Sequence, residues 1–573
     1  MNTIKKTNYT AVILAGGLGI RMRSDVPKGL VPILEKPMIY YIISELLKIN
    51  NSMDINNINN INNINNINNS GIPLSSKAIT TKTINIKNGI NNKNINSINS
   101  INSINNADKI FKKDNDNIDY NSTGIIDRII IVIGHKGEQI KDYIKNEYIF
   151  KNCGITIDFA VQDKYLGTGD AAKQAAKLLE SINKNSGNAE NILILPCDVP
   201  LITKDTLYKL IKFHNESDDD LTVLSFETEN PFSYGRILKD DKNFVKSIIE
   251  QQEIAKYPDN NALQIIKEVN SAIYAIKLKH FTNFINFIDN NNSKKEYYLT
   301  DIISIFYNQS LKVQSFVGVN DYNKYELMGV NTKIELMQCS GLMQKRIIND
   351  LIEKQDVNFI STDNIYIGSN VAISEKATLY PGCFLSGNSK IGENAVIECG
   401  AIVKNSVIGK NSVIKSYSVL EDVIVRDEVN IGPFARLRPK TYIKNNAKIG
   451  NFVEVKNSVI GVNSKASHLS YIGDSEIGDN VNIGAGVITC NYDGFNKHKT
   501  IIKNNCFIGS DSQLIAPVTI EKNSYVASGT TVVKNVPEGS LALSRIKQIN
   551  KEGWTLKRLK KLKELKNIDN ENV

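Results

Sequence analysis

Two groups of residues in this sequence have the types and the spacing that chemistry requires. In the first group, the glycine-rich segment from Leu14 to Met22 carries Arg21 and is followed by Pro27 and Lys28. Glycines let the backbone approach a ligand, and successive N–H groups can hold phosphate oxygens. We interpret this segment as a site for a phosphorylated ligand, with a plain tight turn as the alternative. Its spacing fits neither the P-loop nor the dinucleotide-binding motif, which disfavours an ATPase or a dehydrogenase.

The second group lies in the C-terminal half of the chain and is centred on His468. Arg438 and Lys456 are eighteen residues apart, and the segment from Cys490 to Gly494 adds further polar groups. Imidazole is well matched to general-base catalysis near neutral pH, and two neighbouring cations suit a sugar phosphate. We expect the other four histidines to be structural or exposed: His135, His214, His280 and His498.

A six-residue period identifies the element that would hold the second group. An aliphatic residue returns at every sixth position over residues 367–403, 431–455 and 502–532. This is the step of a left-handed parallel β-helix, in which three short strands make one coil and residues about eighteen apart stack. The repeat is interrupted over residues 488–502, which predicts a loop on the binding face. Glycines beside the aliphatic residues, such as Gly392, are expected at corners with positive φ.

The N-terminal half alternates apolar runs with helical patterns. Short buried strands are predicted at residues 11–14, 129–133 and 191–195, and helices at 38–47 and 168–180. Such alternation predicts a doubly wound, Rossmann-like α/β sheet with its ligand at the carboxyl ends of the strands.

Composition limits the class of protein. The 573 residues are too many for one core, and the net charge of +9 is too mild to imply a nucleic-acid partner. Seven cysteines form no CxxC pair, which favours a reducing, cytoplasmic location. No window of about eighteen apolar residues exists, so we expect no membrane insertion.

Residues 51–124 repeat Ile-Asn-Asn and Ile-Asn-Ser. Isoleucine at every third position gives no consistent buried face, and Asn is a poor former of helix and strand interiors. We interpret the tract as a low-complexity, largely disordered surface insertion without chemistry. A β-solenoid or an aggregation-prone tract is the alternative.

Further motifs occur between and around these sites, in a fixed order. They are Pro27-Lys28, Gln162 with Leu166-Gly167-Thr168-Gly169, Asp198-Val199-Pro200-Leu201, Tyr234-Gly235-Arg236-Ile237, Glu250, Asn270, Tyr297 to Asp301, Gly329-Val330-Asn331, Ile431 to Pro439, Gly450 to Lys456, Lys465 to Tyr471, and Gly478 to Gly486. As a set they resemble the bacterial bifunctional family of N-acetylglucosamine-1-phosphate uridyltransferase/glucosamine-1-phosphate acetyltransferase. The resemblance covers nearly the whole chain outside residues 51–124.

For the N-terminal half, the resemblance implies binding of UTP and N-acetylglucosamine 1-phosphate. The implied substrate-binding residues are Leu14, Gly16, Gly17, Lys28, Gln162, Gly167, Thr168, Gly235, Glu250, Asn270 and Asn331. Arg21 and Lys28 would be catalytic, and Asp198 and Asn331 would hold one Mg²⁺. Taken alone, Asp198 or Asn331 could instead cap a helix, and Glu250 and Asn270 could be ordinary surface residues.

For the C-terminal half, the resemblance implies acetyl transfer from acetyl-CoA to glucosamine 1-phosphate, with His468 as general base. The implied substrate-binding residues are Arg438, Lys456, Tyr471, Asn482, Ala485, Asn491, Tyr492, Ser510, Ser528 and Arg545. The family also implies a homotrimer, which no countable feature of the sequence demonstrates.

The sequence departs from the family pattern at a few positions. Ile20 stands where Thr is usual, Ser271-Ala272 replaces Thr-Gly, and Ser528 replaces Ala. Pro196-Cys197 precedes Asp198 where an aromatic or small residue and then glycine are common. None of these changes removes a charge, but they affect the expected rate and sugar selectivity.

These observations predict a uridyltransferase domain at residues 1–335, a linker helix at 336–359, and a β-helix acetyltransferase domain at 360–573. Two alternatives remain. The first is a single-function sugar-1-phosphate nucleotidyltransferase with a purely structural β-helix, which the co-occurrence of His468, Lys456 and Arg438 disfavours. The second is a non-catalytic regulatory subunit, which should have lost residues such as Lys28 and Asp198.

Overall fold

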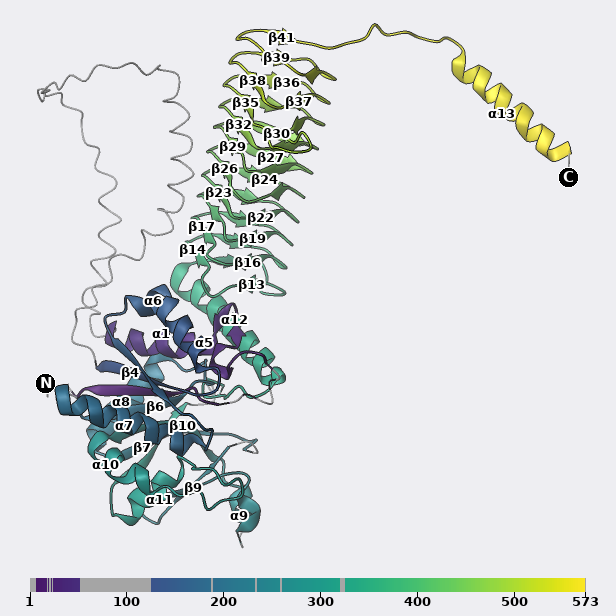
Figure 1. The fold of residues 1–573 in the computed structure, drawn as a ribbon. Helices are drawn as coiled ribbons and strands as arrows, with labels where there is room; N and C mark the ends of the chain where they lie inside the picture. Colours follow the sequence, from purple (N-terminus) through teal and green to yellow (C-terminus); the bar gives the residue numbers. More distant parts are fainter. Residues whose placement is uncertain are drawn as a thin grey trace, which may run out of the picture. The chain divides into compact units, whose positions relative to one another are not determined.

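The chain folds into two compact units, Met1–Arg346 and Ile347–Val573 (Figure 1). The computed structural model describes residues 7–17, 19, 22, 24–51, 125–186, 189–231, 234–257, 260–319 and 325–571. Most of the Asn-rich tract, from residue 52 to 124, therefore lies outside the described residues, as do Ile20 and Arg21.

A nine-stranded sheet forms the centre of the first unit, with the strand order β11-β7-β10-β6-β1-β4-β5 and the pair β8-β9 beside β10. The strands are β1 (Tyr9–Leu14), β4 (Ile126–Ile133), β5 (Thr156–Val161), β6 (Asn191–Pro196), β7 (Leu221–Glu227), β8 (Arg236–Lys239), β9 (Val245–Ile249), β10 (Glu268–Lys277) and β11 (Val313–Val319). Strands β1, β4 and β6 run parallel, as the sequence predicts, and β5, which was not predicted, pairs parallel with β4. Strand β10 is antiparallel to both β6 and β7.

Helices lie on both faces of this sheet (Figure 1). They include α1 (Met38–Asn51), α5 (Gly137–Asn146), α6 (Tyr148–Lys151), α7 (Thr168–Ser186), α8 (Lys204–Ser217), α9 (Asn260–Gln264), α10 (Leu278–Phe284) and α11 (Asp301–Asn308). Alternate residues of the central strands point into two separate cores. Ile129 and Ile131 pack with α1, whereas Ile130 and Val132 pack with α7. Burial on both faces explains why these strands read as unbroken apolar runs.

Helix α12 (Lys333–Gln355) connects the first unit to the second in the chain. Its start is a capping box: Glu335 N donates to Thr332 Oγ1 at 3.2 Å, and the Glu335 carboxylate accepts from the N–H groups of Asn331 and Thr332 at 2.7 Å each. Thr332 is therefore the N-cap residue, and the alternative that Asn331 caps this helix is wrong.

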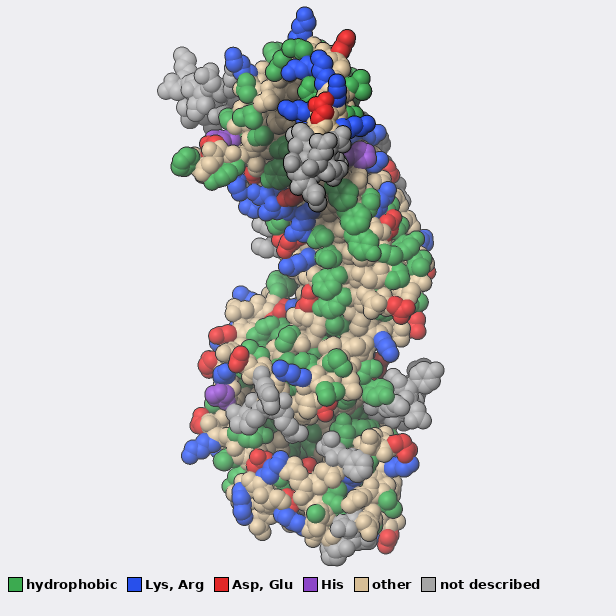
Figure 2. All heavy atoms as spheres, turned by 90° about the vertical axis from the view of Figure 1, so that its right-hand side faces the viewer, with side chains coloured by type: hydrophobic (Ala, Val, Ile, Leu, Met, Phe, Trp, Pro, Cys, Tyr) green, Lys and Arg blue, Asp and Glu red, His purple; other side chains and the backbone are tan. Residues whose placement is uncertain are grey.

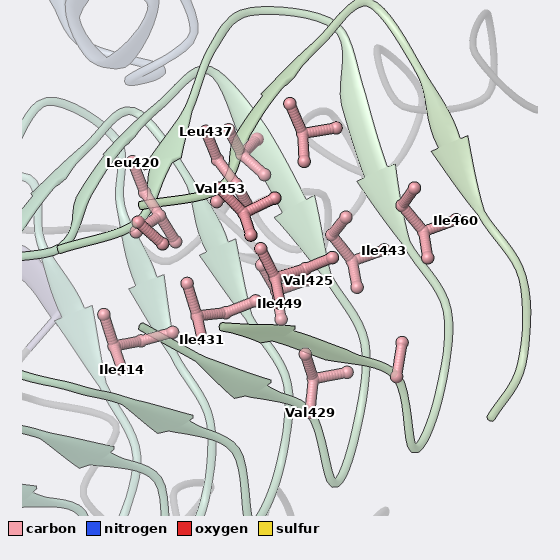
Figure 3. Packing of buried hydrophobic residues seen from close by; sticks show 14 of the residues in the cluster. Ile414, Leu420, Val425, Val429, Ile431, Leu437, Ile443, Ile449, Val453 and Ile460 are labelled. Carbon is pink, nitrogen blue, oxygen red and sulfur yellow. The ribbon is translucent and has the colours of Figure 1, made fainter. Parts of the chain in front are cut away.

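The second unit is a left-handed parallel β-helix built from three sheets of eleven, ten and nine short strands. Its strands run from β12 (Asn358–Phe359) to β41 (Leu541–Ala542), and each pairs with the strand three places further along the chain over nearly the whole stack. Most paired residues are 17 or 18 positions apart, as in Ile414 with Ile431 and Ile431 with Ile449. Figure 3 shows these aliphatic side chains stacked inside the prism, where all three are fully buried.

The glycines beside the aliphatic residues serve a different purpose from the one that the sequence suggested. Among the described residues, Gly432 has a positive φ, but Gly392, Gly409, Gly484 and Gly509 do not. A Cβ on Gly409 would lie 2.4 Å from the carbonyl carbon of Arg426, and one on Gly509 would lie 2.4 Å from the Ser528 nitrogen. The backbone of the next coil therefore excludes a side chain. Most left-handed corners are instead taken by Asn and other non-glycine residues.

The C-terminal helix α13 (Trp554–Glu571) follows the last strand. Its basic residues between 557 and 563 are exposed. In the part of the chain that the structure describes, no helix combines the length and the apolar character needed to span a bilayer.

Candidate functional sites in the two units

In the first unit, Lys28, Asp198 and Asn331 meet at one point although they are far apart in the sequence. Asp198 lies two residues beyond the end of β6. Its carbonyl accepts from the N–H of Val330 at 2.8 Å, which fixes Asn331 beside it. Lys28 Nζ donates to Asn331 Oδ1 at 2.6 Å and pairs with the Asp198 carboxylate. Two oxygen atoms therefore converge on one positive charge.

Asp198 is not a helix cap. Helix α8 is capped by Thr203, whose hydroxyl accepts from the N–H of Thr206 at 3.3 Å. The neighbouring Cys197 is 4 % exposed, and burial raises the pKa of its thiol to about 12. Its thiolate is therefore not available as a nucleophile near neutral pH.

The glycine-rich segment lies against the side chain of Gln162. A Cβ on Gly16 would be 2.7 Å from Gln162 Oε1, so any side chain at this position would displace the Gln162 amide. Gln162 is 3 % exposed, and its Nε2 donates to the carbonyl of Gly167 at 3.0 Å and to Asp170 Oδ2 at 2.7 Å. Gly167 has φ +106° and abuts Tyr297, while Thr168 Oγ1 accepts from the Leu299 N–H at 3.1 Å.

Leu14 ends β1 immediately before this segment. A Cβ built on Gly17 would meet no heavy atom of the described residues within 4 Å, its two chain neighbours aside, so among these residues nothing covers this side of its backbone. Arg21 cannot be placed, because it lies outside the described residues.

Gly235, Glu250 and Asn270 lie on the strands β8, β9 and β10 or at their ends. Asn270 N donates to the Gly235 carbonyl at 2.9 Å, and a Cβ on Gly235 would be 2.7 Å from Ile248 Cγ2. Asn270 is 7 % exposed, so the alternative that it is an ordinary surface residue is wrong. Its side chain donates to the Tyr274 hydroxyl at 2.9 Å and accepts from Ala272 N at 2.9 Å.

Ala272 has φ +63°, in the left-handed region, where a glycine would adopt the same turn without strain. Alanine in place of the family's usual glycine at position 272 therefore strains the local backbone. The turn coincides with a break in the β10–β7 register between Asn270 and Ile273.

Glu250 lines a cavity of about 470 Å³ together with Glu253, Asp289, Tyr298 and Asp301. Burial raises the pKa of Glu250, although a hydrogen bond from Thr300 Oγ1 at 3.1 Å opposes the shift. The pKa of Asp301 rises to about 6, through burial first and then through the charges of Asp289, Glu250 and Glu253. Of the three predicted sugar-binding residues, Glu250 alone is in the lining of this cavity.

In the second unit, the β-helix register places Arg438 beside Lys456. Strands β25 (Arg436–Leu437) and β28 (Glu454–Lys456) pair residue 437 with 455, and Arg438 N donates to the Val455 carbonyl at 2.9 Å. The Arg438 guanidinium donates to Glu454 at 2.8 Å, and Lys456 Nζ lies 4.0 Å from Asp474. The next strand, β31 (Tyr471–Gly473), adds Tyr471 to the same sheet.

His468 ends strand β30 (Lys465–His468) and is exposed. Its Nδ1 lies 2.7 Å from Asn451 Oδ1, and Asn451 is its partner on the preceding coil. An amide oxygen can only accept, so this contact requires Nδ1 to carry the proton. Neutral His468 then has its lone pair on Nε2, the arrangement that a general base needs. Asn451 was not predicted as a partner of His468, because the repeat indicated a step of about eighteen residues and this coil contains 17.

The interruption of the repeat is a loop that reaches from β34 (Ile488–Cys490) to β35 (Thr500–Ile502). Tyr492 and Lys497 form an antiparallel bridge, and Asp493 accepts from Phe495 N at 2.8 Å, Asn496 N at 2.6 Å and His498 Nε2 at 2.6 Å. His498 is thus structural, as predicted, while Asn491 bonds to Asp474.

Lys497 is a further cation at this site that sequence analysis missed. The neighbouring Lys456 side chain is the main cause that lowers the pKa of Lys497. The loop thus brings a third positive charge to Arg438 and Lys456, and its position inside the interrupted repeat was the available signal.

The remaining residues predicted for acetyl transfer lie on successive coils of the β-helix or beyond its last strand. Asn482 opens β33 (Asn482–Ile483), and the Ala485 carbonyl accepts from Asp511 N at 2.7 Å. The Ser510 carbonyl accepts from Gly529 N, next to Ser528, at 2.8 Å. Ala485, Ser510 and Ser528 therefore lie at one corner of the prism. Arg545 is exposed beyond the last strand.

Comparisons with known proteins match different family models to the two units. The family model described as Nucleotidyl transferase matches residues 117–322, GMPPB C-terminal domain matches 367–438, and Bacterial transferase hexapeptide (six repeats) matches 499–534.

Whole-length relatives are similar to both units. A bifunctional protein GlmU of Clostridioides difficile is 40% identical over 78% of this chain and 91% of its own length. That of Thermodesulfovibrio yellowstonii is 37% identical over 96% of this chain and 99% of its own length, and that of Geotalea uraniireducens is 41% identical over 75% and 89%. The chain therefore belongs to the family of bifunctional GlmU proteins.

Proposed function

We propose that this chain acetylates glucosamine 1-phosphate with acetyl-CoA on its β-helix, and transfers a uridylyl group from UTP to N-acetylglucosamine 1-phosphate on its α/β unit. The product would be UDP-N-acetylglucosamine, a precursor of the cell envelope, and pyrophosphate is released. One observation carries the proposal: a single chain holds both the Lys28–Asp198–Asn331 cluster and the coils that bear Arg438, Lys456 and His468.

In uridylyl transfer, the sugar phosphate attacks the α-phosphorus of UTP in line and the bond to pyrophosphate breaks. No protein nucleophile is required, so the work of the protein is positioning and charge neutralisation. Lys28 supplies positive charge beside Asp198, and we assign Arg21 the same role. Leu14, Gly16, Gly17, Gln162, Gly167 and Thr168 are assigned to the nucleotide, and Gly235, Glu250 and Asn270 to the sugar.

The residues at the end of β6 fit a magnesium ion. Asp198 and Asn331 already direct a carboxylate and a carboxamide oxygen at one ammonium group, and Mg²⁺ prefers such oxygen ligands. We propose that these two residues hold the ion. When bound, it would neutralise charge on the phosphates of the substrate.

In acetyl transfer, His468 Nε2 takes a proton from the 2-amino group of the sugar. The amine nitrogen forms a bond to the thioester carbonyl, the C–S bond breaks, and CoA leaves as the thiol after protonation. Arg438 and Lys456 are assigned to the sugar phosphate, and Tyr471, Asn482, Asn491 and Tyr492 to the reacting groups. Ala485, Ser510, Ser528 and Arg545 are assigned to acetyl-CoA.

We further propose that the chain is a homotrimer. A row of stacked aromatic side chains supports assembly through the β-helix: Tyr417 and Phe434 have ring centroids 5.3 Å apart, and Phe434 and Phe452 5.5 Å apart. All three are about half exposed and have positive φ, a costly arrangement for aromatic residues. Figure 2 shows hydrophobic side chains gathered over the surface of the β-helix.

The proposal also assigns residues 1–335 to uridylyl transfer, 336–359 to the linker and 360–573 to acetyl transfer, in the cytoplasm. All seven cysteines are free thiols, which persist in a reducing compartment. No nucleic-acid or membrane partner is part of the proposal.

The two activities can be separated by two substitutions in the full chain. His468→Ala should lower CoA release by about 10²–10⁴-fold, the usual contribution of a general base, and leave pyrophosphate release unchanged. Asp198→Ala should have the reverse effect, and its residual turnover should no longer respond to Mg²⁺ titration. His135→Ala and Asp163→Ala, both at exposed positions, are the controls. Loss of both activities in either variant would refute separate sites, and absence of acetyl transfer from the unaltered chain would favour the single-function alternative.

A further inference from the structure

The side-chain amide of Gln162 is held in one orientation. Its Nε2 has two N–H bonds, and both are used: one donates to the Gly167 carbonyl at 3.0 Å and the other to Asp170 Oδ2 at 2.7 Å. A carbonyl and a carboxylate oxygen can only accept. An inverted amide would therefore place an oxygen atom against two oxygen atoms and lose both hydrogen bonds.

This orientation decides which atom of Gln162 faces the glycine-rich segment. Oε1 lies 2.7 Å from the position of a Cβ on Gly16, and no donor among the described residues is bonded to it. Gln162 thus offers a hydrogen-bond acceptor, and no donor, to a base that lies on the segment from Gly16 to Gly17.

Uracil and cytosine differ at the atom that such an acceptor would meet. Uracil carries an N–H at position 3, whereas the same nitrogen of cytosine is an acceptor. An acceptor fixed on the protein forms a hydrogen bond with N3–H of uracil but faces another acceptor in cytosine. Cytosine is therefore disfavoured, because a buried polar group without a partner is costly.

We infer that Asp170 is a specificity-determining positioning residue: it locks the Gln162 amide so that Oε1 meets the N3–H of uracil, and thereby excludes cytosine. The inference rests on the proposed placement of the nucleotide at Gln162. Asp170 itself is anchored in the first turn of α7, where its Oδ1 accepts from Gln174 Nε2 at 3.2 Å. The carboxylate has no N–H to offer, which is why it enforces a single amide orientation.

The test compares kcat/KM for UTP and CTP in the unaltered chain and in Asp170→Asn. An asparagine amide has the same shape but can donate or accept, so the variant removes one of the two acceptors that oppose the inverted Gln162 and leaves the Gly167 carbonyl in place. We expect the CTP:UTP ratio of kcat/KM to rise at least tenfold, mainly through weaker use of UTP. Damage to the fold would lower kcat/KM for both nucleotides alike, so a change in the ratio reports the orientation of the Gln162 amide. If the asparagine variant fails to fold, Asp170→Ser offers a hydroxyl with the same choice of roles.

Gln174→Leu is the matched control, because it removes the other partner of Asp170 and leaves the bond to Gln162 in place; its ratio should equal that of the unaltered chain. Gln162→Ala separates the inference from the proposed site. If it lowers UTP use but Asp170→Asn leaves the ratio within twofold, the orienting role of Asp170 is overturned. If Gln162→Ala leaves UTP use unchanged, the base is not bound at Gln162 and the proposed site itself is wrong.

Discussion

His214 illustrates how one buried residue can make the α/β unit sensitive to pH. Its Nδ1 lies 2.8 Å from Thr222 Oγ1, and that hydroxyl gives its own proton to Asp219 Oδ2 at 2.9 Å. Nδ1 must therefore be the donor toward Thr222. Nε2 is buried and has no hydrogen-bond partner among the described residues. Protonation of Nε2 would bury a charge, so burial, followed by the charge of Lys277, lowers the pKa of His214 to about 4.

This shift predicts that acid destabilises the first unit. Between about pH 6.5 and 4 the unfolded chain binds a proton that the folded chain excludes, so stability is full above pH 6.5 and falls toward pH 4. The loss is about 3 kcal/mol at most. This loss of stability should be measured by comparing the thermal unfolding of the unaltered chain and of His214→Gln at a series of pH values from 7.5 to 4.5. Equal pH slopes for the two proteins would contradict the assignment.

At the residue scale, sequence patterns found the side chains that stand in motifs but not the partners that orient them. Lys28, Asp198 and His468 each occur in a recognisable segment. Asn451 reaches His468 only because one coil here contains 17 residues, and Asp170 reaches Gln162 only because a buried amide has two donors to satisfy. Such contacts depend on coil length and on hydrogen-bond geometry, which a pattern of residue types does not contain.

At the element scale, the capping box of α12 links helix formation to the proposed uridyltransferase site. Glu335 accepts from the N–H groups of Asn331 and Thr332, while the Asn331 side chain contacts Lys28. The carboxylate that stabilises the first turn of the helix therefore also holds the backbone of the proposed magnesium ligand.

We expect Glu335→Ala to destabilise the helix start by about 1 kcal/mol, the usual effect of losing a cap. Because Asn331 loses its backbone anchor, uridylyl transfer should require more Mg²⁺ for half-maximal activity, and acetyl transfer should be unchanged. Both should be assayed in parallel with a Mg²⁺ titration. Glu353→Ala, at an exposed position near the other end of the same helix, is the control and should change neither activity.

The elements were predicted with uneven success. The hexad period found the β-helix because a buried aliphatic residue must recur once per prism face, and the apolar runs found β1, β4 and β6. The direction of β10 was not predicted, because an apolar run in a buried strand does not encode parallel or antiparallel pairing. The close contacts at Gly409 and Gly509 were mistaken for turns, since glycine serves both needs.

At the scale of the whole molecule, the chain consists of two units with separate hydrophobic cores, and each carries one proposed site. The predicted Asn-rich insertion enters the first unit between α1 and β4. The two ends of this segment are joined directly: Asn50 Nδ2 donates to the Ile126 carbonyl at 2.8 Å, and Ile126 N donates to Asn50 Oδ1 at 2.9 Å. A short connection could therefore replace everything between them.

Replacing residues 52–124 with Gly-Ser-Gly should leave both activities within about twofold of the full chain. The entropic cost of closing a loop is smaller for a shorter loop. The first unit should therefore melt at the same or a higher temperature, with a gain in the free energy of unfolding of up to about 3 kcal/mol. Adding Asn50→Ala to the shortened chain tests the two bonds that join the ends, and it should lower the melting temperature of the first unit only. Insoluble protein, or a selective loss of uridylyl transfer after the deletion alone, would show that the tract packs against this unit. The tract would then be part of the fold rather than an insertion into it.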